Sequence, residues 1–112
     1  MESLVTDDHF VVVGSESALA EGTMVRVTVA GRTVLVCRTR EGVFAIDGVC
    51  THAYAMLGEG RLRGHRLICP LHGASFDVRT GQVLGPPAVE NLSTYRVRIR
   101  DGIVEVETPA DG

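Results

Sequence analysis

The sequence predicts an all-β protein built from antiparallel strands. Short runs rich in β-branched residues are separated by glycines and other turn formers, as in short-stranded β proteins. Near the carboxyl end, residues 95–100 alternate strictly between apolar and charged side chains, and Asp101-Gly102 joins them to a second run, residues 103–106. An Asp-Gly pair between two such runs favours a tight β-hairpin. Helix is expected only at residues 15–21, over barely two turns.

The early strands are expected from their β-branched content, and Gly31 and Gly42 mark turns between them. In chain order the expected strands are Phe10–Val13, Met24–Val29, Thr33–Cys37, Val43–Ile46, Tyr95–Arg100 and Ile103–Val106. The last residues, 109–112, have the composition of a loose tail.

The length, net charge and hydropathy of the chain exclude several classes of function. A chain of 112 residues is expected to form one domain, too short to add a second catalytic domain. The net charge of −3 argues against nucleic acid as a partner. The chain has no apolar run near the length of a membrane span, and Met1-Glu2-Ser3 lacks the basic start of a secretory signal. We therefore expect a cytoplasmic protein with no membrane partner.

Two short pairs of metal-binding residues carry the chemistry. Cys50-Thr51-His52 is followed, after sixteen residues, by Cys69-Pro70-Leu71-His72-Gly73. Two thiolates and two imidazoles could hold zinc in a closed tetrahedral site, or a 2Fe-2S cluster in which two His ligate one iron. The usual finger pattern places both Cys together and then both His together. The alternation of Cys and His in each pair favours the cluster, with zinc as the alternative.

At this level of detail the sequence resembles the Rieske 2Fe-2S domain from about the first strand to Val106. The resemblance is carried by the two ligand pairs and by Leu57, Gly58, Gly60, Phe76-Asp77, Gly81 and a third, proline-bearing loop at Gly85-Pro86-Pro87. It implies one Rieske-type 2Fe-2S cluster bound by Cys50, His52, Cys69 and His72. The two Cys would hold one iron, which stays ferric, and the two His the other iron, which accepts the electron.

The resemblance also implies an architecture. We expect a Rieske-like antiparallel β-sandwich base with an inserted cluster-binding subdomain of short strands and two ligand loops. The whole chain, 1–112, would be a single Rieske domain. Its base would comprise about 1–45 and 86–108, and its cluster-binding subdomain about 46–85.

Several residues indicate which members of the Rieske family the chain resembles. High-potential members carry two further Cys that form a disulfide between the loops, and the corresponding positions here are Ala55 and Leu71. The same members place Ser and Tyr hydroxyls near the cluster sulfurs, where this chain has Ala74 and Phe76. Because hydrogen bonds to sulfur stabilise the reduced state, we expect a potential toward the low end of the Rieske range of roughly −150 to +300 mV.

These features resemble the ferredoxin component of bacterial aromatic-ring-hydroxylating dioxygenase systems, which serve aromatic hydrocarbon catabolism. The resemblance implies a one-electron carrier, not an enzyme, between an NAD(P)H-dependent flavoprotein reductase and a terminal Rieske oxygenase. Docking would be transient and close to His52 and His72. The alternatives are the Rieske small subunit of a nitrite reductase and a structural zinc module.

Three further features each have a structural interpretation: a third cysteine, a group of basic residues, and apolar residues near the loops. Cys37 lies in a β-rich run and is expected to be a small buried hydrophobe. The basic residues between the ligand pairs are interpreted as solvated arms of a hairpin, with orientation of partners as the alternative; they are Arg61, Arg63, His65 and Arg66. Tyr54 and Pro86-Pro87 are candidates for an apolar docking rim, and the alternative is that the prolines only stiffen the third loop. Met56 is expected to pack beneath the loops.

Overall fold

The computed structural model describes residues 10–50, 56–70, 73–88 and 90–107. Within these ranges the chain forms eleven strands and two single-turn 3-10 helices, and every strand pair is antiparallel. The all-β class expected from the sequence is confirmed. In this part of the chain there is no helix long and apolar enough to cross a membrane.

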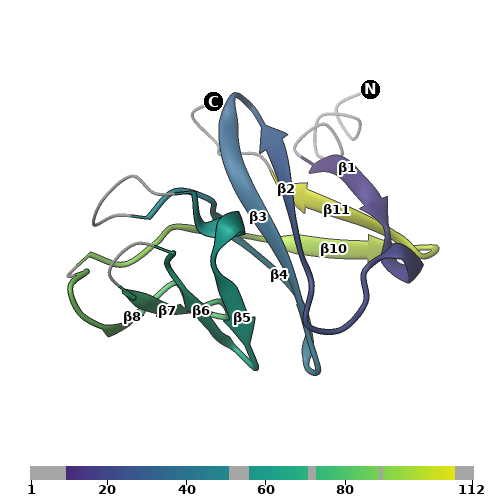
Figure 1. Cartoon of the computed structure of the whole chain (residues 1–112). Helices are drawn as coiled ribbons and strands as arrows, with labels where there is room; N and C mark the ends of the chain where they lie inside the picture. Colours follow the sequence, from purple (N-terminus) through teal and green to yellow (C-terminus); the bar gives the residue numbers. More distant parts are fainter. Residues whose placement is uncertain (1–9, 51–55, 71–72, 89, 108–112) are drawn as a thin grey trace.

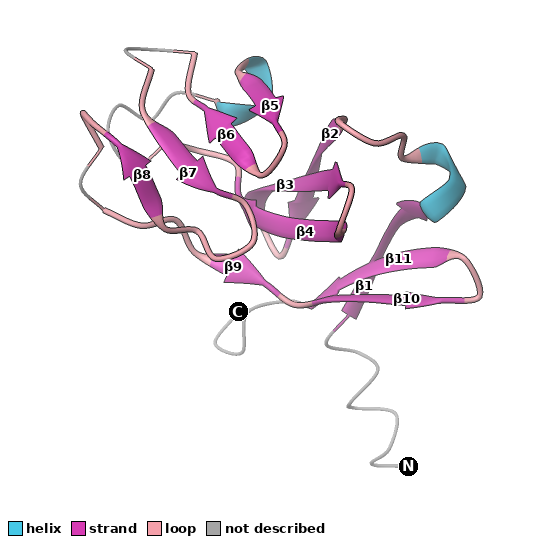
Figure 2. Ribbon diagram, turned by 90° about the horizontal axis from the view of Figure 1, so that it is seen from below, coloured by secondary structure: helices cyan, strands magenta, loops and turns pink. Residues whose placement is uncertain are grey.

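The strands form three sheets, which Figures 1 and 2 show from two directions. The terminal sheet joins the two ends of the chain and contains, in spatial order, β1 (Phe10–Ser15), β11 (Ile103–Glu107) and β10 (Val97–Arg100). The central sheet contains β2 (Met24–Val29), β3 (Arg32–Thr39), β4 (Gly42–Asp47) and β9 (Thr94–Tyr95). The small sheet contains β5 (Arg61–Arg63), β6 (Arg66–Ile68), β7 (Ser75–Asp77) and β8 (Val83–Gly85).

Strand β3 is buried on both faces, and the central sheet lies between the other two (Figure 2). Because successive side chains of a strand point to opposite faces, Val34 and Val36 enter one core, while Leu35 and Cys37 enter the other. The first core joins the central and terminal sheets; its buried members are Leu19, Val29, Val34, Val36, Ala45, Val104 and Val106. The second joins the central and small sheets and includes Leu35, Cys37, Ile46, Leu67 and Phe76.

The structure extends several expected strands by one or two residues and divides one of them. Residues 95–100 were expected as one strand, but Tyr95 pairs with β4 in the central sheet while β10 begins at Val97 in the terminal sheet. A continuous alternating pattern cannot show that a strand changes sheets at one residue.

The helix expected over residues 15–21 is wrong in extent, because only a single 3-10 turn forms at Glu16–Ala18 (η1). Ser15 makes no capping hydrogen bond to the turn, and its hydroxyl lies 2.8 Å from that of Ser17. None of the three helical residues is buried, so no packing supports a longer helix.

The end of β4 is attached to β9 by a side-chain network. The Asp47 carboxylate accepts hydrogen bonds from the Tyr95 hydroxyl at 2.6 Å and from the Ser93 N–H at 3.1 Å. In return, the Asp47 N–H donates to the Ser93 carbonyl at 3.0 Å. Because Asp47 lies three residues before Cys50, this network fixes the point from which the first ligand loop starts.

Replacing Tyr95 with Phe should test this attachment. A hydrogen bond to a charged group typically contributes about 1.5–3 kcal/mol. This bond is only partly buried, so urea denaturation at pH 7 should show a loss near the lower end, about 1.5 kcal/mol. Burial, followed by the bond to Asp47, raises the pKa of Tyr95 above its ordinary value of 10.0. The folded protein therefore holds the phenol proton more tightly than the unfolded chain does. The wild-type advantage is complete below pH 10.0 and shrinks as the pH rises through the raised value.

The control is Thr94→Ala, an exposed neighbour in the same strand. Equal unfolding free energies for wild type and Tyr95→Phe at pH 7 would contradict a structural role for this bond.

Candidate metal centre

The first ligand loop is closed immediately outside Cys50. An isolated antiparallel bridge pairs Val49 with Met56, and the Leu57 N–H donates to the Gly48 carbonyl at 2.8 Å. Cys50 is therefore the first residue inside a closed loop, and its side chain is fully buried. His52, Tyr54 and Ala55 lie outside the described residues.

The second ligand loop is closed in a similar way. Strands β6 and β7 end their pairing at Ile68 and Ser75, and the Cys69 N–H then donates to the Ala74 carbonyl at 2.7 Å. Gly73 has a φ of 74°, a left-handed conformation that glycine adopts without steric cost. Cys69 is buried at the start of this loop, whereas Leu71 and His72 lie outside the described residues.

Cys50 and Cys69 belong to one contiguous buried cluster of side chains, with Leu57, Leu67 and Phe76 among its members. The two predicted cysteine ligands, nineteen positions apart in the sequence, thus enter the same buried cluster, which also contains Cys37. No group of three metal-binding side chains occurs among the described residues. The two predicted histidine ligands, His52 and His72, are outside them, so the set of four stays a prediction.

Gly60 allows the two loops to approach each other. Its N–H donates to the Leu57 carbonyl at 2.9 Å, at the end of the single-turn helix η2 (Leu57–Glu59). A Cβ on Gly60 would overlap the carbonyl oxygen of Ile68, the residue that precedes Cys69. The segment after the first loop therefore packs against the backbone that leads into the second.

The third loop is closed by two hydrogen bonds from backbone N–H groups. The Leu92 N–H donates to the Gly81 carbonyl at 2.8 Å, and the Val83 N–H donates to the Asn91 side-chain oxygen at 2.9 Å. Pro86 and Pro87 lie between these closures and are exposed. This exposure is compatible with the docking role considered for them. Met56, expected beneath the loops, is half-buried.

Polar contacts on the small sheet were not anticipated from the sequence. An Arg66 guanidinium nitrogen donates to the Ser75 hydroxyl at 2.7 Å. Arg79 donates to both carboxylate oxygens of Asp77, at 3.1 and 3.0 Å. These hydrogen bonds hold the pKa of the Asp77 carboxyl below its usual value. An alternating strand pattern could have placed Arg66 and Asp77 on one face, but their partners depend on the register of three-residue strands.

Cys37 lies apart from the ligand loops in the sequence and is fully buried in β3. Burial raises the pKa of its thiol to about 12. A thiol with that pKa is a poor nucleophile and a poor metal ligand near neutral pH. These properties agree with the role of a buried hydrophobe.

Residues 9–96 match the family pattern of the Rieske [2Fe-2S] domain. The chain belongs to this family. Among characterised relatives, the ferredoxin component of the naphthalene 1,2-dioxygenase system of Pseudomonas putida is 38% identical to this Rieske domain over 85 residues. The alignment covers 76% of this chain and 82% of the relative.

Solved structures of Rieske ferredoxins superpose on nearly the whole fold of this chain. The ferredoxin of carbazole 1,9a-dioxygenase from Nocardioides aromaticivorans IC177 superposes with a TM-score of 0.86 at 32% identity, covering 89% of this Rieske domain and 98% of that chain. A chain from the complex of reduced oxygenase and oxidized ferredoxin in carbazole 1,9a-dioxygenase superposes with a TM-score of 0.85 at 33% identity. This second match covers 88% of this chain and 93% of that chain.

Gly60→Ala should displace the end of β6, because the new methyl group would meet backbone atoms that no side-chain rotation can move. We expect lower thermal stability and a clear loss of iron and acid-labile sulfide per chain. Gly58→Ala is the matched control from the same turn, because its Cβ would lie 3.4 Å from the flexible Leu35 side chain. Equal iron content and stability in the two variants would contradict a role for the close approach at Gly60.

Proposed function

We propose that this Rieske domain is a ferredoxin that carries single electrons on one 2Fe-2S cluster. The principal support is that Cys50 and Cys69 each begin a hydrogen-bonded loop and share one buried cluster of side chains. Membership of the Rieske [2Fe-2S] family supports iron and sulfide over the zinc alternative.

The proposed ligands are Cys50, His52, Cys69 and His72, with both Cys on one iron and both His on the other. The donor types fit such a centre, because two thiolates and two neutral imidazoles are the ligand set of a Rieske cluster. When bound, the cluster supplies a site that gains and loses one electron. The chain contributes a rigid mount, because backbone hydrogen bonds fix the start of each loop at Cys50 and at Cys69.

We also propose that the chain divides into a base and a cluster-binding subdomain. The small sheet, which lies within residues 61–85, together with the first ligand loop would form the cluster-binding subdomain at about 46–85. The terminal and central sheets would form the base. Asp47 and Ser93, which are hydrogen-bonded at the edge of the central sheet, lie close to the points where the chain enters and leaves the proposed subdomain.

The proposed partners are an NAD(P)H-dependent flavoprotein reductase and a terminal aromatic-ring-hydroxylating oxygenase. Support comes from the relatives, which are ferredoxin components of dioxygenase systems, and from the match to the complex of oxygenase and ferredoxin. Transient docking would occur near His52 and His72. These relatives favour a shuttle over the small subunit of a nitrite reductase, which would form a stable complex. We further propose a cytoplasmic location, because none of Cys37, Cys50 and Cys69, all of them described, forms a disulfide, as expected in a reducing compartment.

Low-temperature EPR of the purified protein after anaerobic reduction with dithionite tests the cluster. We expect a rhombic signal whose average g value lies below that of all-Cys 2Fe-2S ferredoxins, together with two irons and two sulfides per chain. A colourless, EPR-silent protein that contains zinc would refute the proposal.

Electron delivery is tested by replacing the native ferredoxin of the Pseudomonas putida naphthalene dioxygenase system with this protein. NADH-dependent product formation that requires this protein would support the shuttle. A cluster-loaded protein recovered only in a stable complex with a large reductase, and inactive in this assay, would refute it.

The low expected potential can be tested at Ala74, which is fully buried at the closure of the second ligand loop. Ala74→Ser adds a hydroxyl where high-potential relatives carry one, and we expect the reduction potential to rise because a donor stabilises the reduced cluster. Ala45→Ser is the control, because it adds the same group to the core between the central and terminal sheets. The control should lower stability without moving the potential. Identical potentials in wild type and Ala74→Ser would contradict the assignment.

A further inference from the structure

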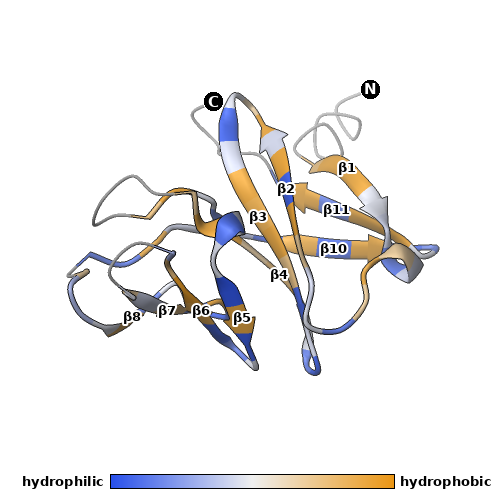
Figure 3. Cartoon of the chain, in the orientation of Figure 1, coloured by the Kyte–Doolittle hydropathy of each residue, from blue (hydrophilic) through white to orange (hydrophobic). Residues whose placement is uncertain are grey.

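The small sheet has one apolar face and one arginine-rich face. Leu62, Leu67 and Phe76 are cross-strand partners on the face that packs into the core. The neighbouring residues in each strand must point the other way. Register places Arg61 opposite Ile68, and Arg63 opposite Arg66. Figure 3 shows β5 as hydrophilic on either side of a hydrophobic middle.

We name Arg61, Arg63 and Arg66 the arginine face; all three are exposed. No side-chain hydrogen bond or ion pair connects the guanidinium group of Arg61 or Arg63 to any other described residue. Arg66 donates to a neutral hydroxyl, that of Ser75. The positive charges of the three guanidinium groups are therefore not neutralised by carboxylates among the described residues.

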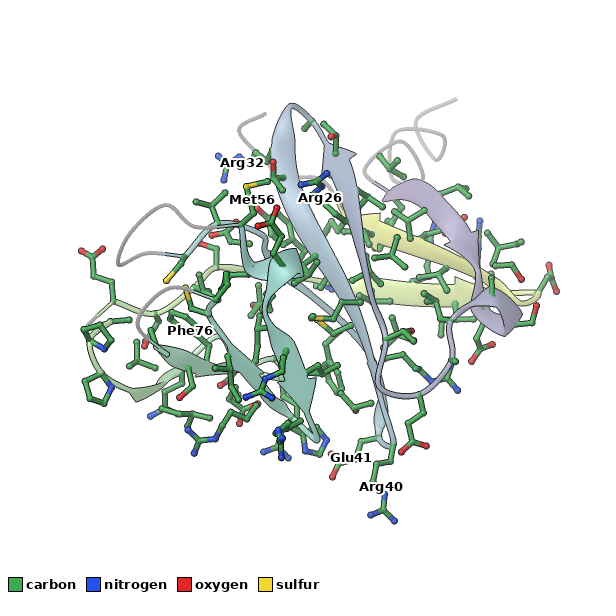
Figure 4. All side chains as sticks on the ribbon, in the orientation of Figure 1. Arg26, Arg32, Arg40, Glu41, Met56 and Phe76 are labelled. Carbon is green, nitrogen blue, oxygen red and sulfur yellow. The ribbon has the colours of Figure 1, made fainter. Side chains whose placement is uncertain are left out.

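Two carboxylates on this side of the molecule, those of Asp77 and Glu41, are already paired. Asp77, which is opposite Arg66 in the register, is bound by Arg79 through two hydrogen bonds. Glu41, at the tip of the β3–β4 turn in Figure 4, lies 3.5 Å from Arg79 and 3.6 Å from the His65 ring nitrogen. These pairings leave a local positive field on a chain whose net charge is −3.

The arginine face adjoins the proposed electron-transfer end of the molecule. Arg61 is opposite Ile68, and Ile68 is bonded to Cys69. Arg63 lies two residues further along the strand, or about 7 Å at the usual strand rise. The backbones of both residues thus lie within or close to one Debye length, about 8 Å at physiological ionic strength, of the strand end that carries the proposed ligand. A charge at this distance acts on any partner that approaches that end.

Exposed apolar side chains border the same end of the sheet on its opposite edge. Leu84 in β8 is 42% exposed, and Pro86 and Pro87 follow it and are also exposed. Protein interfaces combine apolar contacts with arginine. Nucleic-acid-binding surfaces commonly provide exposed aromatic rings on which bases stack. The only aromatic residue in strands β5 to β8 is Phe76, which is buried.

We propose that the arginine face is a docking surface for a carboxylate-rich patch on the redox protein that exchanges electrons with the cluster. This inference rests on the proposed function and names the chemistry of the partner. The arginines orient the partner as it approaches, so that its own redox centre meets the end of the sheet at Cys69. The net negative charge of the chain repels an acidic partner elsewhere, which makes the local field a determinant of orientation.

The test measures oxidation of the dithionite-reduced protein by two haem proteins of opposite charge, acidic cytochrome b5 and basic cytochrome c, in a stopped-flow instrument. Arg61→Glu/Arg63→Glu should slow the reaction with cytochrome b5 about tenfold at low ionic strength and accelerate the reaction with cytochrome c. Both effects should disappear at about 0.5 M salt, where charges are screened within about 4 Å. Arg61→Gln/Arg63→Gln should give intermediate rates.

The matched control is Arg96→Glu/Arg100→Glu, which changes the net charge equally but lies in and beside the terminal sheet. Equal rate changes in the control and test variants would show an effect of total charge and overturn the proposal. So would unchanged rates in a test variant that keeps its full EPR signal. Absence of any cluster in the wild type would instead refute the proposed function, so the two failures are distinguishable.

Discussion

The double burial of β3 determines how the rest of the molecule is arranged. Four consecutive side chains, Val34 to Cys37, are almost completely inaccessible to solvent, which requires a layer on each face of the central sheet. One layer is made from the two ends of the chain and the other from its middle. Because burying a large aliphatic side chain contributes about 1.5–3 kcal/mol, neither layer can be removed without exposing a row of apolar side chains. The small sheet therefore depends on the central sheet for its stability and its position.

The ligand loops depend on that position. Each loop begins where a strand or bridge ends, so the location of Cys50 and Cys69 is determined by backbone hydrogen bonds at the edge of the packed layers. The close approach at Gly60 connects the two loop bases directly. A site mounted in this way holds its ligands by the fold and not by the metal alone, which suits a centre whose geometry must change little between oxidation states.

The parts of the fold that could be predicted from the sequence are those with a strong local pattern. The hairpin joining β10 and β11 follows from strict alternation and an Asp-Gly turn, and Asp101 indeed has a positive φ of 53°. The strands of the small sheet could not be located, because three residues are too few to show a period. The ligand pairs pointed to Cys50 and Cys69, each of which begins a hydrogen-bonded loop, and the full ligand set stays a prediction. The contact at Gly60 could not be predicted, because it depends on two backbone segments that pack only in the folded protein.

The burial of Cys37 has a consequence for how a metal centre could assemble in this chain. With a pKa of about 12, its thiol is ionised in only about one molecule in 10⁵ at pH 7. Metals bind thiolates, so a buried and protonated sulfur competes weakly for iron near neutral pH. Cys37 belongs to the same buried cluster as Cys50 and Cys69. Burial in β3 thereby leaves a third sulfur chemically quiet in the cluster that contains the two predicted cysteine ligands.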